Sequence, residues 1–368
     1  MPVESRTIIP TIAQDADTRA DTLVHAASAA LDAAGSHERR ALRELALPVE
    51  HRLDERTLAS LRRRLAAAAA PIERGVRLGA AQRLGAMQAV AAAERLLDDP
   101  VSLLADLFAL AANEALVLSE LLAIVRLEAL AANLPPGAST GADRPSLLAR
   151  LAGCPEPDIA EAASALLAAH NRQAPDVAPP LPVVMRDRLV WWTAALLRDR
   201  MAEDPRVDHA LVEAAAEMID ATPDEVSPQS SAMRFAELVG ARPDELPALL
   251  LEAIGDRQPV LFVALLAHAS GLTFGAVRAM LTDAAGERLW LLLRAQDLDR
   301  ATIARIGVAL AEADPRRDLD RFVAALDVAM TVAPERAAAV FAGASLPPCY
   351  RAALADVRTL GATGASGR

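Results

Sequence analysis

The chain has 368 residues, of which 53% are hydrophobic, 3% aromatic and 24% charged, and its formal net charge is −11. All 38 basic residues are Arg, so the sequence excludes mechanisms that need a Lys amine, such as Schiff-base catalysis and the phosphate-loop Lys of nucleotide-binding proteins. Ala and Leu dominate, whereas β-branched and aromatic residues are scarce, and this balance favours helices over sheets. The length is enough for about two domains with a sizeable core.

The sequence predicts a protein of the cytoplasm. The first 20 residues carry three acidic side chains and no apolar core segment, so we expect no signal peptide. The two cysteines, Cys154 and Cys349, are too few and too far apart for a disulfide framework, which indicates reduced thiols. The longest apolar stretch, residues 101–125, is interrupted by acidic residues, and we interpret it as two packed core helices instead of a membrane span. The negative net charge argues against nucleic acid as a partner.

The predicted organisation in chain order is two helical halves with irregular ends. We expect a flexible extension over residues 1–16, an N-terminal helical half over 17–173 and a Pro-rich linker over 174–182. A C-terminal helical half follows over 183–360, and the Gly- and Ser-containing tail 361–368 is expected to be disordered.

Helix signals repeat along both halves. Asp99-Pro100 and Asp204-Pro205 each offer an N-cap followed by Pro at the first helical position. Apolar residues recur at helical spacing in between, for example at Leu58, Leu61 and Leu65. No stretch alternates between apolar and polar residues in the manner of a strand, so strands are expected to be absent or marginal.

Glycines set a rhythm in the second half. Gly240, Gly255, Gly271 and Gly286 fall 15, 16 and 15 residues apart, and Gly is favoured at helix ends because it accepts the left-handed conformation. One short helix and one tight turn fit this period, and two of them make a helix pair of about 31 residues. The sequence therefore predicts an all-α fold of stacked antiparallel helix pairs, either a HEAT-like α-solenoid or an irregular helical array.

Residues Leu249 to Leu298 resemble a known family through the order of their features. A Leu-rich helix ends in Gly255-Asp256, an apolar helix from Phe262 to His268 follows, and Gly271-Leu272 precedes a helix that closes with Leu281-Thr282-Asp283. This order resembles the C-terminal part of the bacterial domain-of-unknown-function family 2336, with weaker similarity from Leu53 onward; a single Phe at position 262 replaces an expected aromatic pair. The resemblance implies a helical-repeat protein and brings no activity, cofactor or site residue with it.

No catalytic constellation is present in the sequence. It lacks a nucleophile-elbow motif, a dinucleotide-binding glycine motif and zinc spacing, so we expect a protein that is not an enzyme and has no cofactor. His209, Glu213 and Glu217 share one helix face at i, i+4 and i+8 and could hold a metal. The partner Glu-x-x-His motif of carboxylate-bridged bundles is missing, so we interpret these three residues as the solvent face of an amphipathic helix.

Positive charge is concentrated in one region. Residues 38–97 carry a net charge of +5, whereas the rest of the chain carries −16. Within this region Arg74, Arg77 and Arg83 form a partial helical stripe that could meet a phosphate or an acidic protein surface. The alternative is a solvated face that pairs with acidic residues of the same protein.

The adjacent Trp191 and Trp192 form the second distinctive feature. Neighbouring helical residues point about 100° apart, and Trp192 shares its face with apolar residues, which predicts a core position. Trp191 is flanked by Arg188 and Arg198 at i−3 and i+7, as in an interface anchor beside cationic side chains. Alternatively, Trp191 packs under the Pro-rich segment 174–182.

Three functional hypotheses follow. The first is a non-catalytic scaffold or adaptor that binds protein partners, with Trp191, Arg188 and Arg198 as one patch and Arg74, Arg77 and Arg83 as another. The second is a ligand-responsive regulator that encloses a small anionic molecule with converging Arg side chains. The third is a metalloenzyme at His209, Glu213 and Glu217.

Overall fold

The protein is all-α, as predicted. The computed structural model describes residues 18–28, 53–99, 101–136, 145–171, 181–221 and 227–344, with residues 346, 350 and 353, and these ranges contain helices and no strand. The predicted extension 1–16, the tail 361–368 and residues 174–180 of the predicted linker lie outside the described residues, as does Cys349.

The chain forms two compact units, and each unit is assembled from separated segments. Unit 1 comprises Met1–Ala41, Arg126–Leu167 and Ser231–Arg368, and unit 2 comprises Leu42–Val125 and Ala168–Ser230. Both units therefore draw on residues from either side of the Pro-rich segment 174–182, which differs from the sequential halves predicted there. Each unit has a separate cluster of buried hydrophobic side chains.

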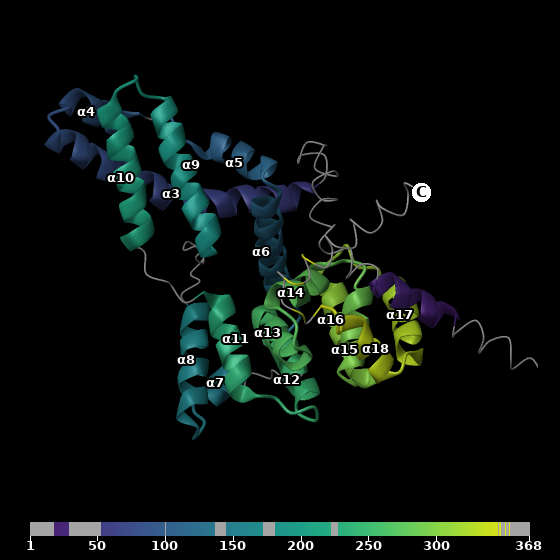
Figure 1. The fold of residues 1–368 in the computed structure, drawn as a ribbon. Coiled ribbons are helices and arrows are strands. Elements are labelled where there is room, and N and C mark those ends of the chain that lie inside the picture. Colours follow the sequence, from purple (N-terminus) through teal and green to yellow (C-terminus); the bar gives the residue numbers. More distant parts are fainter. Residues whose placement is uncertain are drawn as a thin grey trace, which may run out of the picture. The chain divides into compact units, whose positions relative to one another are not determined.

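Unit 2 is built on one long helix. Helix α3 (Glu55–Ala86) packs against α4 (Val90–Asp98), α5 (Leu104–Asn113), α9 (Val183–Asp199) and α10 (Pro205–Ala221), as Figure 1 shows. Glycines allow the closest of these approaches, because a Cβ on Gly79 would lie 3.2 Å from the Cβ of Ala214 on α10. The same helix buries Leu61 and Leu65 at the predicted spacing, whereas Leu58 is only partly buried.

Local capping explains where some of these helices begin. Asp204 precedes Pro205 at the start of α10 and accepts a hydrogen bond from the backbone N–H of Arg206 (2.9 Å), so this predicted helix start is confirmed. The prediction at Asp99-Pro100 is wrong, because Asp99 follows the end of α4 and the next helix begins only at Leu104. The carboxylate of Asp99 accepts from the backbone N–H of Val101 (3.1 Å) in a turn that precedes the helix.

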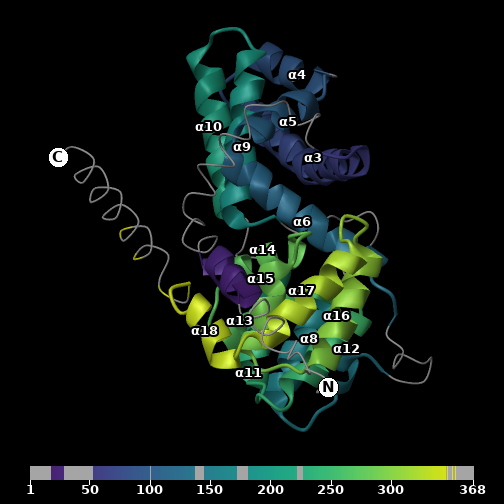
Figure 2. The ribbon, with the colours of Figure 1, turned by 90° about the vertical axis from the view of Figure 1, so that its right-hand side faces the viewer.

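The remaining described helices form or enter unit 1 (Figure 2). They are a helix over residues 18–28, α6 (Ala115–Asn133), α7 (Leu147–Leu151), α8 (Pro157–Asn171), α11 (Pro228–Val239), α12 (Leu246–Gly255), α13 (Pro259–Ser270), α14 (Phe274–Thr282), α15 (Glu287–Ala295), α16 (Arg300–Ala313), α17 (Leu319–Thr331) and α18 (Pro334–Phe341). Helices α6, α8 and α11 run across the boundary between the two units. Helices α5 and α6 confirm that residues 101–125 contribute to two helices.

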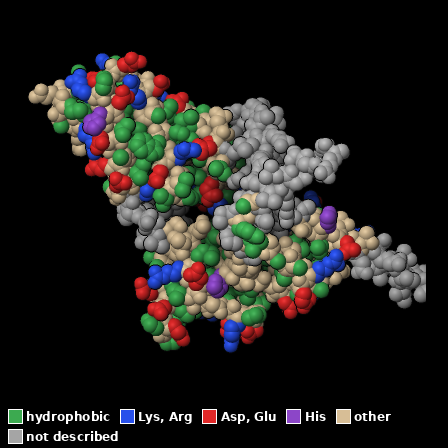
Figure 3. Space-filling model, in the orientation of Figure 1, with side chains coloured by type: hydrophobic (Ala, Val, Ile, Leu, Met, Phe, Trp, Pro, Cys, Tyr) green, Lys and Arg blue, Asp and Glu red, His purple; other side chains and the backbone are tan. Residues whose placement is uncertain are grey.

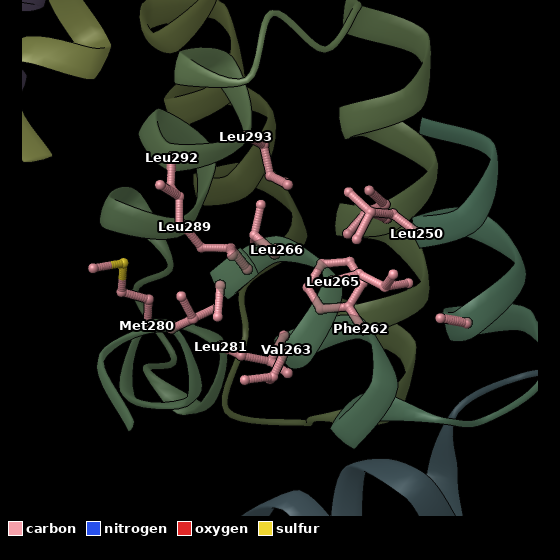
Figure 4. Close-up of a cluster of buried hydrophobic side chains, with 14 of the residues drawn as sticks. Leu250, Phe262, Val263, Leu265, Leu266, Met280, Leu281, Leu289, Leu292 and Leu293 are labelled. Atoms are coloured by element: carbon pink, nitrogen blue, oxygen red, sulfur yellow. The ribbon is translucent and has the colours of Figure 1, made fainter. Parts of the chain in front are cut away.

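Helix α13 forms the centre of unit 1. Its residues from Leu261 to Ala267 are all buried, so the helix is apolar on every side, which is the pattern of an enclosed helix. Figure 4 shows side chains of α13, including Phe262 and Leu266, in one cluster with Leu250 of α12, side chains of α14 and leucines of α15. Burial of these seven residues accounts for the strong apolar character of this stretch.

The glycine rhythm corresponds to real helix ends, with one exception. Gly240, Gly271 and Gly286 have positive φ angles of 51°, 67° and 69°, and α12, α13 and α14 each occupy one interval between successive glycines. Gly255 is instead the last residue of α12, and the left-handed position there is taken by Arg257 (φ 57°). The short-helix period is confirmed, whereas a repeated two-helix unit stays a prediction.

Candidate functional site

One face of α9 carries exposed apolar side chains. Val184, Arg188, Trp191 and Ala195 are spaced at i, i+4, i+7 and i+11 and fall within about 60° around the helix axis. Val184 is 84% exposed and Trp191 is 43% exposed, whereas the opposite face is buried in the core of unit 2. Figure 3 shows hydrophobic side chains gathered along this helix between charged ones. We call Val184, Arg188, Trp191 and Ala195 the α9 stripe.

The structure separates the two tryptophans as predicted. Trp192 packs against the core of unit 2 next to the buried Met185 and Leu189, and Trp191 lies on the exposed stripe. Residues 174–180, under which Trp191 was alternatively expected to pack, lie outside the described residues.

The arginines beside Trp191 are held by carboxylates. Arg188 donates two bonds from Nε and Nη2 to the carboxylate of Glu114 (3.1 and 2.8 Å), and these hydrogen bonds raise the pKa of the Arg188 guanidinium. Arg198 is paired in the same way with Asp208, which raises the pKa of Arg198. Both cations therefore have acidic partners within unit 2, and the α9 stripe combines the apolar Val184, Trp191 and Ala195 with the ion-paired Arg188.

A further exposed apolar residue follows the partner of Arg188 in the sequence. Glu114 precedes α6, and Leu116 in the first turn of that helix is 60% exposed. The sequence did not identify Leu116 and Val184 as surface residues. Apolar residues at helical spacing indicate that one face of a helix is buried, but they do not show whether apolar residues on the other faces are covered.

The structure does not bring Arg74, Arg77 and Arg83 onto one surface. Arg74 is exposed, but Arg77 is buried, and its Nη1 donates to the backbone carbonyl of Leu96 (2.7 Å). Arg77 also pairs with Glu73 (2.8 Å). The expected stripe is therefore wrong in its geometry, since a long helix packed against α4 turns Arg77 inward.

The third member of that stripe also has a partner within the protein. Arg83 pairs with Glu217 and donates to the backbone carbonyl of Gly79 (2.9 Å). The interactions of Arg77 and Arg83 support the alternative in which these arginines neutralise acidic residues of their own unit, and they do not converge on a common ligand site.

The residues considered for a metal lie on the surface of α10. His209, Glu213 and Glu217 are all exposed, and Glu217 is the partner of Arg83. Within the part of the chain that the structure describes, no three His, Cys, Asp or Glu side chains lie close enough together to hold a metal ion. Cys154 is a free thiol that is partly buried.

Unit 1 contains a further arginine cluster that the sequence did not single out. Arg316 and Arg317 lie between α16 and α17, and the Arg317 side chain is only 3% exposed. The only sequence signal for this cluster was the run Asp314-Pro315-Arg316-Arg317 between two helices. This signal is weak because Arg is frequent throughout the chain.

The fold defines this chain as an all-α helical-array protein of two units. Residues 141–342 match a family described as "Uncharacterised protein conserved in bacteria (DUF2336)". The match covers more than half of the chain, so the protein belongs to this family. It includes α9, with the α9 stripe, and the segment from Leu249 to Leu298 on which the resemblance was recognised.

Other comparisons add no relative, since no curated protein and no solved structure matches the chain. Among the described helices no single one is long and apolar enough to cross a membrane, although the bent pair Leu104–Asn113 and Leu116–Asn133 together reaches the required length and composition.

Proposed function

We propose that the protein is a non-catalytic interaction module, a cytoplasmic scaffold or adaptor that binds a protein partner through the α9 stripe. The observation that carries this proposal is the exposure of Trp191 and Val184 on one face of a helix whose other face is buried. A partly exposed aromatic residue beside neutralised charges is the kind of anchor that dominates protein interfaces. The site also lies inside the segment that defines the family.

The spacing of the stripe indicates the geometry of the partner. Positions i, i+4, i+7 and i+11 form the ridge that one helix presents to another, so we propose that the apolar face of a partner helix packs along α9. Arg188 and Arg198 already have acidic partners, which leaves apolar burial as the main source of affinity. The paired arginines then form the polar rim around Trp191.

The test compares substitutions of equal chemistry on the stripe and away from it. Val184→Asp places a charge on the most exposed apolar residue, in the first turn of α9 where an acidic side chain suits the helix dipole, so the fold is preserved. Val323→Asp on α17 is the matched control, because Val323 is also exposed, at 46%, and belongs to unit 1.

Tagged wild-type, Val184→Asp and Val323→Asp proteins are expressed in the native bacterium, crosslinked and purified, and the captured proteins are quantified by mass spectrometry. The proposal expects a partner that the wild type and Val323→Asp retain and Val184→Asp loses. It also expects Trp191→Ala to weaken binding of that partner by about 2 kcal/mol, or roughly thirtyfold in Kd. Equal capture by the wild type, Val184→Asp and Val323→Asp contradicts the proposed surface.

A further inference from the structure

Buried N–H groups of Trp290 and Arg317 in unit 1 have no acceptor among the described residues, namely Nε1 of Trp290 and both Nε and Nη1 of Arg317. Trp290 is 2% exposed and its indole Nε1 makes no hydrogen bond. The Arg317 side chain is 3% exposed, and its Nη1 likewise makes none. Buried donors are almost always paired in folded proteins, so such donors in one place point to an absent acceptor.

The fold brings Nε1 of Trp290 and Nη1 of Arg317 together at Gly286. This residue precedes α15 with a φ angle of 69°, and a Cβ placed on it would lie 2.8 Å from Cε2 of Trp290, the atom bonded to Nε1, and 2.9 Å from Nη1 of Arg317. The absence of a side chain at Gly286 therefore lets both side chains pack directly against its backbone, since a Cβ there would collide with them. The Arg317 guanidinium also lies 5.9 Å from the centre of the Trp290 ring.

Arg317 is fixed in this position by the end of α14. Its Nη2 donates to the backbone carbonyl of Leu281 (2.5 Å), which leaves Nη1 as the donor next to Gly286. The guanidinium is therefore already oriented before any acceptor arrives, and an anion would gain a preorganised donor.

A cavity of about 90 Å³ opens beside these donors. Its walls include Trp290, Arg317 and Arg316 together with the small or apolar residues Ala285, Ala311 and Phe322. A single water needs only about 10–15 Å³, so the cavity has room for a group of several atoms. The lining thus combines apolar side chains with guanidinium groups and one carboxylate, that of Asp318.

Three arginines, Arg316, Arg317 and Arg321, and one carboxylate, that of Asp318, line the cavity. Asp314 accepts hydrogen bonds from Arg316 (2.7 and 2.9 Å) and also lies 3.8 Å from Nε of Arg317, so one carboxylate serves two guanidinium groups. The nearby carboxylates of Asp283 and Glu287 pair with other arginines. Burial lowers the pKa of the Arg317 guanidinium, as expected for a cation that is incompletely compensated.

We propose that this cavity binds the oxyanion group of a small molecule, a carboxylate or a phosphate, which accepts hydrogen bonds from Nη1 of Arg317 and Nε1 of Trp290. An oxyanion supplies the missing acceptor for both donors and forms a charge-assisted hydrogen bond with the guanidinium of Arg317. The site lies in unit 1 and is separate from the α9 stripe of unit 2, so it stands independently of the proposed partner surface.

The indole N–H signal of Trp290 tests the proposal in the full-length protein. The chain has three tryptophans, and comparison with Trp290→Phe assigns the Trp290 signal in a ¹H–¹⁵N spectrum. Sodium phosphate and sodium acetate are titrated separately at constant ionic strength, with sodium chloride as the reference salt.

The expected result is a saturable shift of the Trp290 indole signal with at least one of the two oxyanions and none with chloride. Phosphate alone indicates a phosphorylated ligand, acetate alone a carboxylate, and both indicate recognition of oxyanions in general. Failure of both salts to shift this signal, or an equal shift with chloride, overturns the proposal.

Two variants with a matched control separate binding from folding. Arg317→Gln removes the charged donor and is expected to weaken oxyanion binding at least about tenfold. The control Arg305→Gln changes an exposed arginine of α16 and is expected to leave binding unchanged. Ala311→Leu fills the cavity while both donors stay in place, and it is expected to abolish the shift even if Arg317→Gln does not fold. A shift that survives Ala311→Leu unchanged overturns the proposed site.

Discussion

The burial of Arg77 makes a sharp prediction about stability. Arg77→Met keeps the aliphatic length of the side chain but removes the guanidinium that donates to the carbonyl of Leu96 (2.7 Å) and pairs with Glu73 (2.8 Å). The Arg77 side chain is only 11% exposed and that of Glu73 20%, so water compensates little for the lost partners. We expect unit 2 to lose about 3 kcal/mol of unfolding free energy, the sum of an unsatisfied buried carbonyl and a broken, partly buried ion pair.

The matched control is Arg74→Met on the same helix. Arg74 is exposed, so the substitution is expected to change the unfolding free energy by no more than about 0.5 kcal/mol. The measurement is urea unfolding followed by hydrogen exchange and mass spectrometry, which reports the peptides of α3 and α4 separately from those of unit 1. A loss below about 1 kcal/mol for Arg77→Met, or equal losses for both variants, would refute the structural role of Arg77.

The other predictions concern unit 1. A Cβ on Gly307 would lie 2.0 Å from the ring of Phe322, so Gly307→Ala is expected to destabilise the unit by about 1–3 kcal/mol in urea unfolding, whereas Gly275→Ala meets no atom within 4 Å and is expected to be neutral or slightly stabilising. Equal effects of the two substitutions would contradict this packing. Burial opposes ionisation of Asp314, but hydrogen bonds from Arg316 outweigh this effect and hold the pKa of the carboxyl below its ordinary value. The ionised Asp314 therefore stabilises the folded protein above about pH 3.9, and this contribution disappears as the pH falls through the lower folded-state pKa. Asp314→Asn is therefore expected to be about 2 kcal/mol less stable than the wild type at pH 7, with the difference closing in acid, and a difference that persists unchanged at low pH would contradict the assignment.

The sequence predicts those features of the fold that depend on neighbouring residues. The start of α10 follows from Asp204 and Pro205, because capping is decided within one helical turn. The intervals set by Gly240, Gly271 and Gly286 are similarly local, since each of these residues accepts a positive φ angle. Asp99-Pro100 carries the same local signal, yet Asp99 closes α4, and its carboxylate lies 3.7 Å from both Arg77 and Arg200. Tertiary contacts of this kind are not visible in a local motif.

The candidate sites were predictable only in part, for a related reason. The sequence offered an exposed position for Trp191 beside Arg188 and Arg198 as one of two alternatives, and Trp191 is 43% exposed in the structure. Arg74 and Arg77 lie about 60° apart around α3, so the sequence alone does not decide which of them faces α4. Trp290 and Arg317 are 27 positions apart, and only the folded turn at Gly286 brings their N–H groups to one cavity.

Site-specific photo-crosslinking from the α9 stripe tests the proposed interaction module without assuming the partner's identity. A photoreactive phenylalanine derivative replaces Trp191 in one protein and the exposed Val323 of unit 1 in another, and both are irradiated in living cells of the native bacterium. We predict a discrete crosslinked protein adduct from position 191 that disappears when Val184→Asp is added, and none of the same mass from position 323. No adduct from position 191, or the same adduct from both positions, would contradict a partner-binding surface on α9.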